Sequence, residues 1–319
     1  MSTAIDPTVL QSVAMSILMC PCHERAAREH SELPEEEQTL LWSDLTGIDA
    51  KRLNGKGFVE YEEPNTLVQE SLIRLQLELD RIEDKPAYDQ ALKRSPVYVT
   101  NELFRLKFLR AEKFDCHAAA VRMKCHFEKK LKLFGPDKLG REILLSDLDQ
   151  DDMESMNMGF FQVLSSLDVN NRTVVLWYKA CSNCYKHREN IVSKYIAHIP
   201  TKASPIMRLF TCHLTRYIIF HSLHLQLRTV WYIFNVISHD EMCQKRGVVS
   251  VVYNNGGFPK GGMDYEKSRR LGFLFRGIPI RMDSFLVCLD ESPWLNVVGA
   301  FSVIVSKHLR IRMRTIPGK

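Results

Sequence analysis

The chain has 319 residues, of which 45% are hydrophobic and 25% are charged; it can therefore fill a sizeable core and has the composition of a soluble protein with one large or two modest domains. Its net charge of +5 is uneven, because residues from Lys260 onward hold 11 Lys and Arg against 5 Asp and Glu (+6), which leaves −1 for residues 1–259. A local excess of cations fits the phosphates of a lipid headgroup, a membrane surface or a nucleic acid. The amino terminus has no cationic stretch followed by an apolar one, so no secretory signal is expected.

Residues 1–95 are expected to form an N-terminal extension that is partly disordered and contains one amphipathic helix. Between Leu67 and Ile82, apolar residues recur at spacings of three and four, which predicts a helix with a single apolar stripe. The stripe consists of Val68, Leu72, Leu75, Leu79 and Ile82. Because it spans barely two heptads, we expect it to dock on the main body rather than to form a coiled coil.

Residues 96–140 are expected to form a compact helical unit. Leu103, Leu106 and Leu109–Ala111 give a first helix a short apolar face. Asp115 is expected to cap a second helix, which Gly135 and Pro136 end. The apolar residues of that second helix are Ala119, Met123, Phe127, Leu131 and Phe134.

The remaining residues alternate between two kinds of pattern. Segments rich in Val, Ile and aromatic residues predict strands; they are Arg141–Ser146, Thr173–Tyr178, Gly247–Tyr253, Pro279–Leu289 and Arg310–Ile316. Helical patterns lie between them, near Asp152–Leu167, Leu227–Cys243, Tyr265–Phe275 and Trp294–His308. Strands that alternate with helices predict an α/β sheet with helical cover.

Two neighbouring motifs resemble the entry segment of the CRAL-TRIO lipid-binding family. They are Phe108-Leu-Arg-Ala-Glu-Lys-Phe-Asp115 and, one helix later, Phe134-Gly-Pro-Asp-Lys-Leu-Gly-Arg141. Weaker similarities follow in the family's order at Arg246–Gly257, at Gly277–Leu289, and at Ser292-Pro293-Trp294, where the family places a gating helix over its lipid cavity. The resemblance covers roughly residues 97–178 and 225–317.

The resemblance implies a small N-terminal helical bundle (residues 96–140) followed by a lipid-binding domain (residues 141–319). In that domain a mixed β-sheet covered by helices would enclose an apolar pocket. The implied function is binding, and intermembrane transfer, of a phospholipid or isoprenoid-like lipid. The alternative is a lipid-sensing or protein-interaction module on the same fold that does not transfer its ligand.

Three features depart from the family pattern. Asn254 and Asn255 stand where the family usually has Asp. Residues 180–224 exceed the usual connection, so we expect either a genuine insertion or unspliced intron sequence included in the predicted coding sequence. The chain stops at Lys319, where the family usually continues with further helices, so a C-terminal truncation is also an expectation.

The expected lipid pocket draws on two strands and one helix. Because side chains alternate along a strand, Val249, Val251 and Tyr253 lie on one face of their strand. Phe285, Val287 and Leu289 likewise share one face of theirs. Either set could line a pocket. Plain core is the other reading of these residues. The expected gate is the helix 294–305, with apolar residues around most of its circumference: Trp294, Val298, Phe301 and Val305, with Val297.

The segment that contains the gate cannot cross a membrane. Its second apolar run has about 12 residues and would cover roughly 18 Å as a helix, against a hydrocarbon core of ~30 Å. Asp290, Glu291 and Pro293 separate it from the run before it. We therefore expect transient contact with a membrane surface instead.

A cationic row follows the gate and is expected to meet a headgroup or an anionic membrane; it consists of Lys307, Arg310, Arg312 and Arg314. A solvated strand edge is the other reading of this row. The apolar stretch 303–305 lies where phosphoinositide-binding members have a Lys, so inositol-lipid specificity is not expected. A nucleic-acid partner is not expected either, because the cations are not interleaved with aromatic residues in a recognised module.

The nine cysteines predict reduced thiols and a cytoplasmic protein. Cys181 and Cys184, and Cys20 and Cys22, are close pairs that lack a further ligand pair at zinc-site spacing, although the two pairs could meet in space. No nucleophile motif or phosphate-binding loop is present, so we expect no enzyme, no metal and no cofactor. The expected partners are a lipid, a membrane surface and a protein that binds through residues 1–95.

Overall fold

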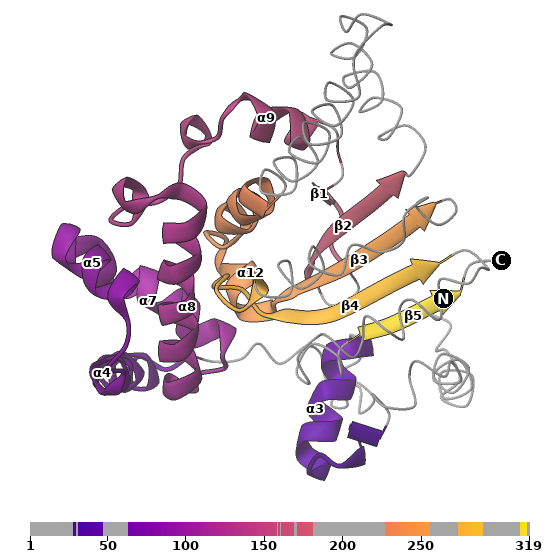
Figure 1. The fold of residues 1–319 in the computed structure, drawn as a ribbon. Coiled ribbons are helices and arrows are strands. Elements are labelled where there is room, and N and C mark those ends of the chain that lie inside the picture. The colour runs from indigo at the N-terminus through magenta and orange to yellow at the C-terminus, as the bar shows by residue number, and fades with distance from the viewer. Residues whose placement is uncertain are drawn as a thin grey trace, which may run out of the picture.

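The computed structural model shows a helical bundle beside a β-sheet (Figure 1). The residues it describes are 28–29, 31–46, 63–157, 159, 161–168, 171–180, 227–255, 274–289 and 313–317. The described part is thus a mixed structure of helices and strands, which agrees with the predicted α/β class.

The bundle consists of helices from residues 65 to 134, arranged around one of them. Their bounds are α4 (Asn65–Arg81), α5 (Pro86–Arg94), α6 (Pro96–Val99), α7 (Glu102–Ala111) and α8 (Cys116–Phe134). α4, α5 and α7 all contact α8, and their apolar residues form one cluster, the bundle core, which includes Leu75, Leu79, Phe108 and Phe127. An earlier helix, α3 (Glu35–Thr46), contacts the sheet instead.

α4 confirms the predicted amphipathic helix and its docking on the main body. Leu72, Leu75 and Leu79 are buried, and Val68 and Ile82 pack against the bundle core. The bundle core therefore joins helices on both sides of residue 95, where we expected a domain boundary.

The ends of α8 also agree with the prediction. The Asp115 carboxylate accepts a hydrogen bond from the Ala118 amide at the amino end. At the other end Gly135 has φ +78°, and a short 3-10 turn, η2 (Pro136–Lys138), follows.

The predicted apolar face of α7 was wrong at one position, because Leu103 is 72% exposed. Phe104 and Phe108 are buried instead. α7 contacts α4 and α8 on the bundle side and α12 (Glu241–Arg246) beyond it. A helix with neighbours on several sides buries more than one stripe, so its sequence period no longer shows which side is covered.

The sheet has five strands in the order of the chain. They are β1 (Phe161–Val163), β2 (Thr173–Ala180), β3 (Val248–Asn255), β4 (Met282–Leu289) and β5 (Met313–Pro317). β1 pairs antiparallel with β2, and every later pair is parallel. β2 to β5 match four predicted strands, each within three residues at its start.

The predicted strand Arg141–Ser146 is absent, and a 3-10 turn, η3 (Leu145–Asp147), lies there instead. The Asp147 carboxylate accepts hydrogen bonds from the Leu144 amide and from the Arg141 guanidinium. These local bonds occupy groups that a strand would pair with a neighbour.

Two predicted helices were wrong in extent. The helix expected near Asp152–Leu167 is α9 (Gln150–Asn157), and β1 follows it. The helix expected at Leu227–Cys243 stops after residue 237, and α12 starts anew at Glu241. Asp240 causes the restart because its carboxylate accepts the Met242 amide hydrogen bond. The helix expected at 294–308 lies outside the described residues, as does most of that at 265–275.

The register defines two faces of the sheet. On the face that we call the helix-covered face, apolar residues of β1 to β4 pack against Val230, Trp231 and Phe234 of the helix 227–237. We call this cluster the sheet core; its strand residues include Phe161, Val175, Val248, Phe285 and Val287. The side that carries Val249 and its neighbours is called the opposite face.

Candidate functional site

The register separates the predicted pocket residues into two groups. Ser250 pairs with Phe285 and Val252 with Val287, whereas Val251 pairs with Leu286. Paired residues of parallel strands lie on the same face, and successive residues alternate. Phe285 and Val287 are therefore on the helix-covered face, and Val249, Val251 and Tyr253 are on the opposite face. The two sets cannot line one pocket together.

Packing loosens along β2 and β3 toward their carboxyl ends. On the helix-covered face Val175 and Ser250 are fully buried, whereas Trp177 and Val252, one step further along each strand, are half-buried. On the opposite face Val249 is buried and Val251 and Tyr253 are half-buried. Ligands of open α/β sheets bind beyond the carboxyl ends of the strands, so this end of the sheet is the candidate site.

An aromatic wall stands at this end of the helix-covered face. Phe161 of β1 meets the Trp177 ring edge to face at a centroid distance of 4.4 Å, and Phe234 lies 5.3 Å from Phe161. Phe275 contacts both Trp177 (5.8 Å) and Phe234 (5.5 Å). These rings come from two strands, the helix 227–237 and the helical residue 275 before β4, so the wall is apolar.

The amino ends of the strands are closed by charged groups. Asp283 of β4 is buried, and its carboxylate accepts a 2.5 Å hydrogen bond from Nε of Arg281. Arg172, just before β2, comes within 4.0 Å of the same carboxylate. Gly247, just before β3, has no room for a side chain, because a Cβ there would lie 2.3 Å from Asp283 Oδ2. Such a dense ionic closure stabilises the sheet and leaves the carboxyl ends as the place for a ligand.

Arg110, in the motif that resembles the CRAL-TRIO entry segment, joins the bundle to the sheet unit. Its guanidinium donates two hydrogen bonds to Glu63 from Nε (3.0 and 2.9 Å) and one from Nη2 (2.6 Å). It also donates to Gln244 (2.6 Å) and Glu241 (2.8 Å) of α12. The sequence shows a cation in a mostly apolar helix, but no spacing rule pairs it with residues more than a hundred positions away.

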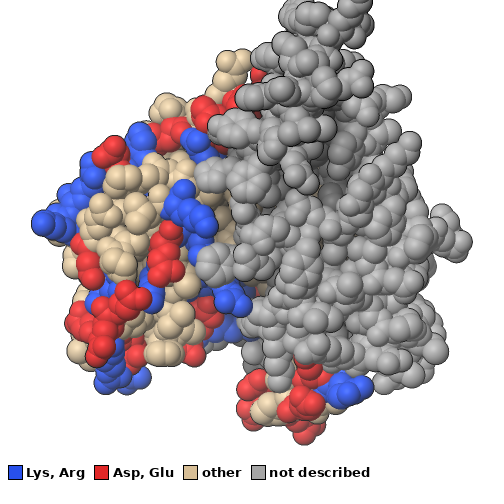
Figure 2. Space-filling model, in the orientation of Figure 1, with Lys and Arg blue, Asp and Glu red and all other residues tan. Residues whose placement is uncertain are grey.

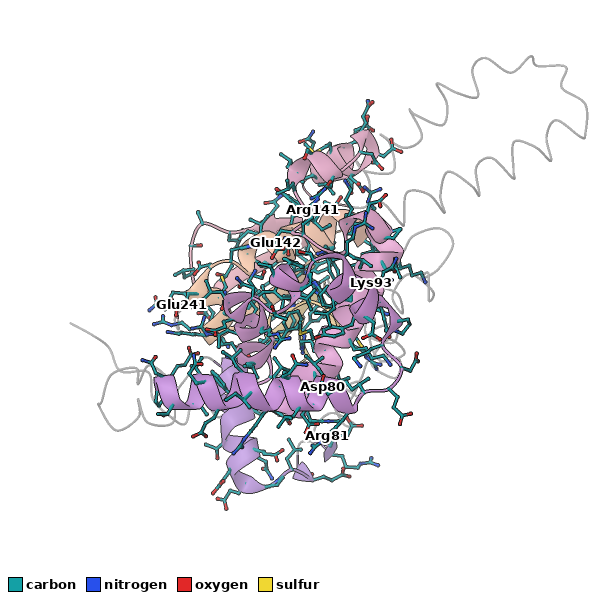
Figure 3. All side chains as sticks on the ribbon, turned by 90° about the vertical axis from the view of Figure 1, so that its left-hand side faces the viewer. Asp80, Arg81, Lys93, Arg141, Glu142 and Glu241 are labelled. Atoms are coloured by element: carbon teal, nitrogen blue, oxygen red, sulfur yellow. The ribbon has the colours of Figure 1, made fainter. Side chains whose placement is uncertain are left out.

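A second polar cluster surrounds Glu142 at the same interface, where Figure 3 shows Glu142 next to Arg141. Lys107 of α7 and His239 lie 3.6 and 3.7 Å from its carboxylate. Burial alone would raise the pKa of Glu142, but His239, Lys107 and Lys130 outweigh it and lower that pKa to about 2. Lys130 is itself buried, which lowers its pKa to about 8 although Glu142 opposes the shift. Sequence reasoning missed this cluster because its members come from four separate segments.

His126 of α8 lies between the two cores. Its Nδ1 is 2.9 Å from the Gly277 carbonyl, and its ring contacts Trp231 of the sheet core in a tilted arrangement with a centroid distance of 4.8 Å. Phe108 and Phe127 of the bundle core contact its other sides. Burial lowers the pKa of His126 to about 3, with a smaller contribution from the charge of Lys130, so the ring is neutral at pH 7.

Most of the predicted gate and cationic row lies outside the described residues. This holds for Trp294, Val298, Phe301, Val305, Lys307, Arg310 and Arg312. Arg314 is in β5, where it pairs with Leu286 and so occupies a position on the opposite face. On the bundle face shown in Figure 2, cations and carboxylates are interspersed.

Surveys of the described residues find no group of three or more His, Cys, Asp or Glu that could hold a metal ion, and no helix in that part is long and apolar enough to cross a membrane. The described cysteines Cys116, Cys125, Cys243 and Cys288 are free thiols. The close pairs at 20–22 and 181–184 lie outside the described residues.

A comparison with models of known protein families found no match, and neither did a search of curated proteins.

Proposed function

We propose that the chain binds a hydrophobic ligand, a phospholipid or an isoprenoid-like lipid, at the carboxyl ends of β2 to β4 and exchanges it with membranes. The observation that carries this proposal is the aromatic wall at the end of the sheet where packing loosens. The element order, a helical bundle followed by a mostly parallel sheet, is the one implied by the resemblance to the CRAL-TRIO family.

The topology suggests which face the gate would cover. β2, β3, β4 and β5 are neighbours in chain order and parallel, so right-handed crossovers put all their connections on one face. The described part of the β2–β3 connection, the helix 227–237, packs on the helix-covered face. The proposed gate 294–305 belongs to the β4–β5 connection and would meet Phe285 and Val287 there. Val249, Val251 and Tyr253 would then lie behind the pocket.

The magnitudes suit a carrier. Burial of about ten methylene groups at about 0.8 kcal/mol each contributes about 8 kcal/mol, and the cost of association reduces this to the affinity of an exchangeable complex. Such a complex holds a lipid through water and still releases it. The proposed cationic row of Lys307, Arg310, Arg312 and Arg314 would add about 1 kcal/mol per cation near an anionic leaflet. We propose this peripheral contact as the step at which the gate opens.

A transfer assay with a matched pair of variants tests the proposal. Val298→Asp places a charge on the proposed gate, and we expect it to abolish transfer of fluorescent phosphatidylcholine between labelled vesicles. Leu103→Asp places the same charge on an exposed site of the bundle, and it should transfer as the wild type does. Circular dichroism would check that both variants fold. Wild-type transfer by Val298→Asp, or the absence of lipid from the protein by mass spectrometry, would contradict the proposal.

A lipid-sensing or protein-docking module that does not transfer its ligand is the second candidate. Ile73 and Leu77 favour it, because these residues lie one turn apart on α4 and are 65% and 53% exposed. An exposed apolar pair on one helix face is a common feature of docking surfaces. Purified protein without extractable lipid, together with a cellular partner lost on Ile73→Glu/Leu77→Glu, would favour this function over transfer.

A further inference from the structure

The corner between α5 and α6 carries a serine whose hydroxyl does not cap a helix. Ser95 ends α5 and precedes Pro96, the first residue of α6, a position at which serine normally caps a helix through its side chain. Its side chain makes no such hydrogen bond. The corner is open to solvent, because Ser95 is only half-buried and its neighbours Lys93, Arg94, Pro96 and Val97 are exposed, Val97 to 81%.

The segment 136–141, which follows the bundle, lies directly against this corner. A Cβ on Gly140 would be 2.9 Å from the Cβ of Ser95 and 3.5 Å from Cγ of Arg94. The Arg94 guanidinium also donates hydrogen bonds to the Pro136 carbonyl (3.0 Å) and to the Asp137 carboxylate (2.7 Å). Ser95 therefore lies between its own helix corner and a segment that is distant in the sequence.

The charges around Ser95 do not balance. The cations of the corner and of the adjacent segment are Lys93, Arg94, Lys138 and Arg141. Asp137 pairs with the first arginine, and Asp147 pairs with the second lysine (2.7 Å) and the second arginine (2.6 Å). The next carboxylate, Glu142, is matched by the buried cations Lys107 and Lys130. Four cations thus face two carboxylates, an excess of two positive charges (4 − 2), and a phosphoserine carries about −1.5 to −2 at pH 7.

The sequence of this corner is also that of a kinase substrate. Lys93-Arg94-Ser95-Pro96 is a Ser-Pro dipeptide preceded by two cations, a pattern that proline-directed protein kinases modify. Proline biases the residue before it toward an extended backbone, and Ser95 has φ −149° and ψ 83°. The other Ser-Pro dipeptides of the chain, Ser204-Pro205 and Ser292-Pro293, have no cation directly before the serine.

We propose that Ser95 is a phosphorylation site for a proline-directed protein kinase, and that its phosphate binds the arginines and lysines of the two segments. In this reaction the Ser95 oxygen forms a bond to the γ-phosphorus of MgATP, the bond between the β- and γ-phosphates breaks, and ADP leaves. The hydroxyl proton passes to the catalytic aspartate of the kinase.

The phosphate would connect the α5–α6 corner to the segment that leads from the bundle to the sheet. Arginine suits this contact, because its planar guanidinium donates two parallel hydrogen bonds to a phosphate. The inference goes beyond the proposed function and is independent of it, because it requires no lipid.

The site is tested by incubation of the full-length protein with MgATP and a mitogen-activated protein kinase, followed by mass spectrometry of its peptides. We expect phosphate on Ser95 of the wild type and none at this position in Ser95→Ala. Pro96→Ala keeps the hydroxyl and should lose most of the phosphate. Wild-type protein without phosphate at Ser95 would overturn the proposal, as would full phosphorylation of Pro96→Ala.

A matched pair of variants tests the phosphate contacts without a kinase. Ser95→Asp introduces a negative charge, and Ser95→Asn has nearly the same shape without one. At low salt we expect the aspartate variant to melt about 2 °C higher than the asparagine variant. The difference should vanish in about 1 M NaCl, because ions screen exposed charges, and it should shrink when both variants also carry Arg94→Gln. Equal melting temperatures at low salt, or a difference that salt does not remove, would overturn the binding of phosphate by these cations.

Discussion

Arg110 shows how a single side chain can connect two parts of this chain. Its guanidinium is almost fully buried, yet hydrogen bonds to Glu63, Gln244 and Glu241 occupy its donors. Arg suits this role because its planar fork can bind a carboxylate with two nitrogens at once. Glu63 depends on the arrangement, because its side chain is 8% exposed and its other cationic neighbour, Lys245, is 4.0 Å away and makes a weaker contact.

Replacement of Arg110 by Ala should destabilise the protein by about 3–5 kcal/mol, because Gln244 and Glu241 lose a partner and buried Glu63 keeps only the 4.0 Å contact with Lys245. Urea denaturation followed by circular dichroism would measure the change. Arg81 gives the control, because it lies at the end of α4 (Figure 3) and is 74% exposed, although it pairs with Glu78. Arg81→Ala should change the free energy of unfolding by less than about 1 kcal/mol. An Arg110→Ala variant that unfolds at the wild-type urea concentration would contradict this role.

At the scale of elements, sequence patterns were reliable where local rules decide the structure. The apolar stripe of α4, the Asp115 cap of α8 and the Val-rich core of β3 follow from period and capping. Sequence patterns failed where a side chain forms a hydrogen bond that the spacing of apolar residues does not reveal. Asp147 prevents the strand expected at 141–146, and Asp240 starts a new helix within the one expected at 227–243.

The candidate site was less predictable than the elements that build it. Alternation predicts which residues share a face with Val249 and which share a face with Phe285. Whether the two sets lie on the same face of the sheet depends on the strand register, which long-range pairing sets. The aromatic wall brings together Phe161, Phe234 and Phe275 from segments far apart in the chain. Both features depend on tertiary contacts that a single sequence does not contain.

The junction of α12 and β3 provides a test at this scale, through two glycines with nearly the same backbone. Gly247 has φ +72° and ψ −171°, and Gly135 has φ +78° and ψ 175°, a region that is essentially restricted to glycine. A Cβ on Gly135 would meet nothing within 4 Å, whereas one on Gly247 would collide with buried Asp283. The pair therefore separates backbone strain from steric conflict.

Gly135→Ala should cost about 1–3 kcal/mol, from backbone strain alone. Gly247→Ala should cost at least about 2 kcal/mol more, because the collision displaces Asp283 from Arg281 as well. Thermal or urea unfolding of the two variants under the same conditions measures the difference. Equal destabilisation would mean that the junction relaxes freely and that the ionic closure at the amino ends of the strands is not rigid.

At the scale of the whole molecule, α8 belongs to both cores. Met123 and Phe127 lie in the bundle core, and Leu133 lies in the sheet core. Arg122 donates hydrogen bonds to the carbonyls of Phe275 (3.1 Å) and Ile278 (2.8 Å) on the sheet side. His126 fills the space between the cores. A change in the charge of His126 should therefore affect the packing of the bundle core against the sheet core.

The free energy of unfolding should therefore depend on pH through His126, which lies between the two cores. Its pKa is about 3 in the folded chain and about 6.5 when unfolded, so below pH 6.5 the unfolded state binds a proton that the folded state excludes. The stabilisation from the neutral ring is therefore fully present above pH 6.5 and is lost as the pH falls toward 3. The loss amounts to about 1.4 kcal/mol per pH unit, or about 2 kcal/mol between pH 6.5 and 5.

The prediction is checked by urea unfolding of the wild type and of His126→Asn at several values between pH 7.5 and 5. Asn keeps a donor for the Gly277 carbonyl and does not titrate, so this variant should be less stable throughout but should lack the His126 contribution to the slope. Burial raises the pKa of Asp152 to about 6, and this carboxyl has the opposite effect because the folded state binds its proton first. Since Asp152 is present in both proteins, its contribution cancels in the difference. A difference in stability that stays constant from pH 7.5 to 5 would show that His126 accepts a proton without disturbing the contact between the two cores.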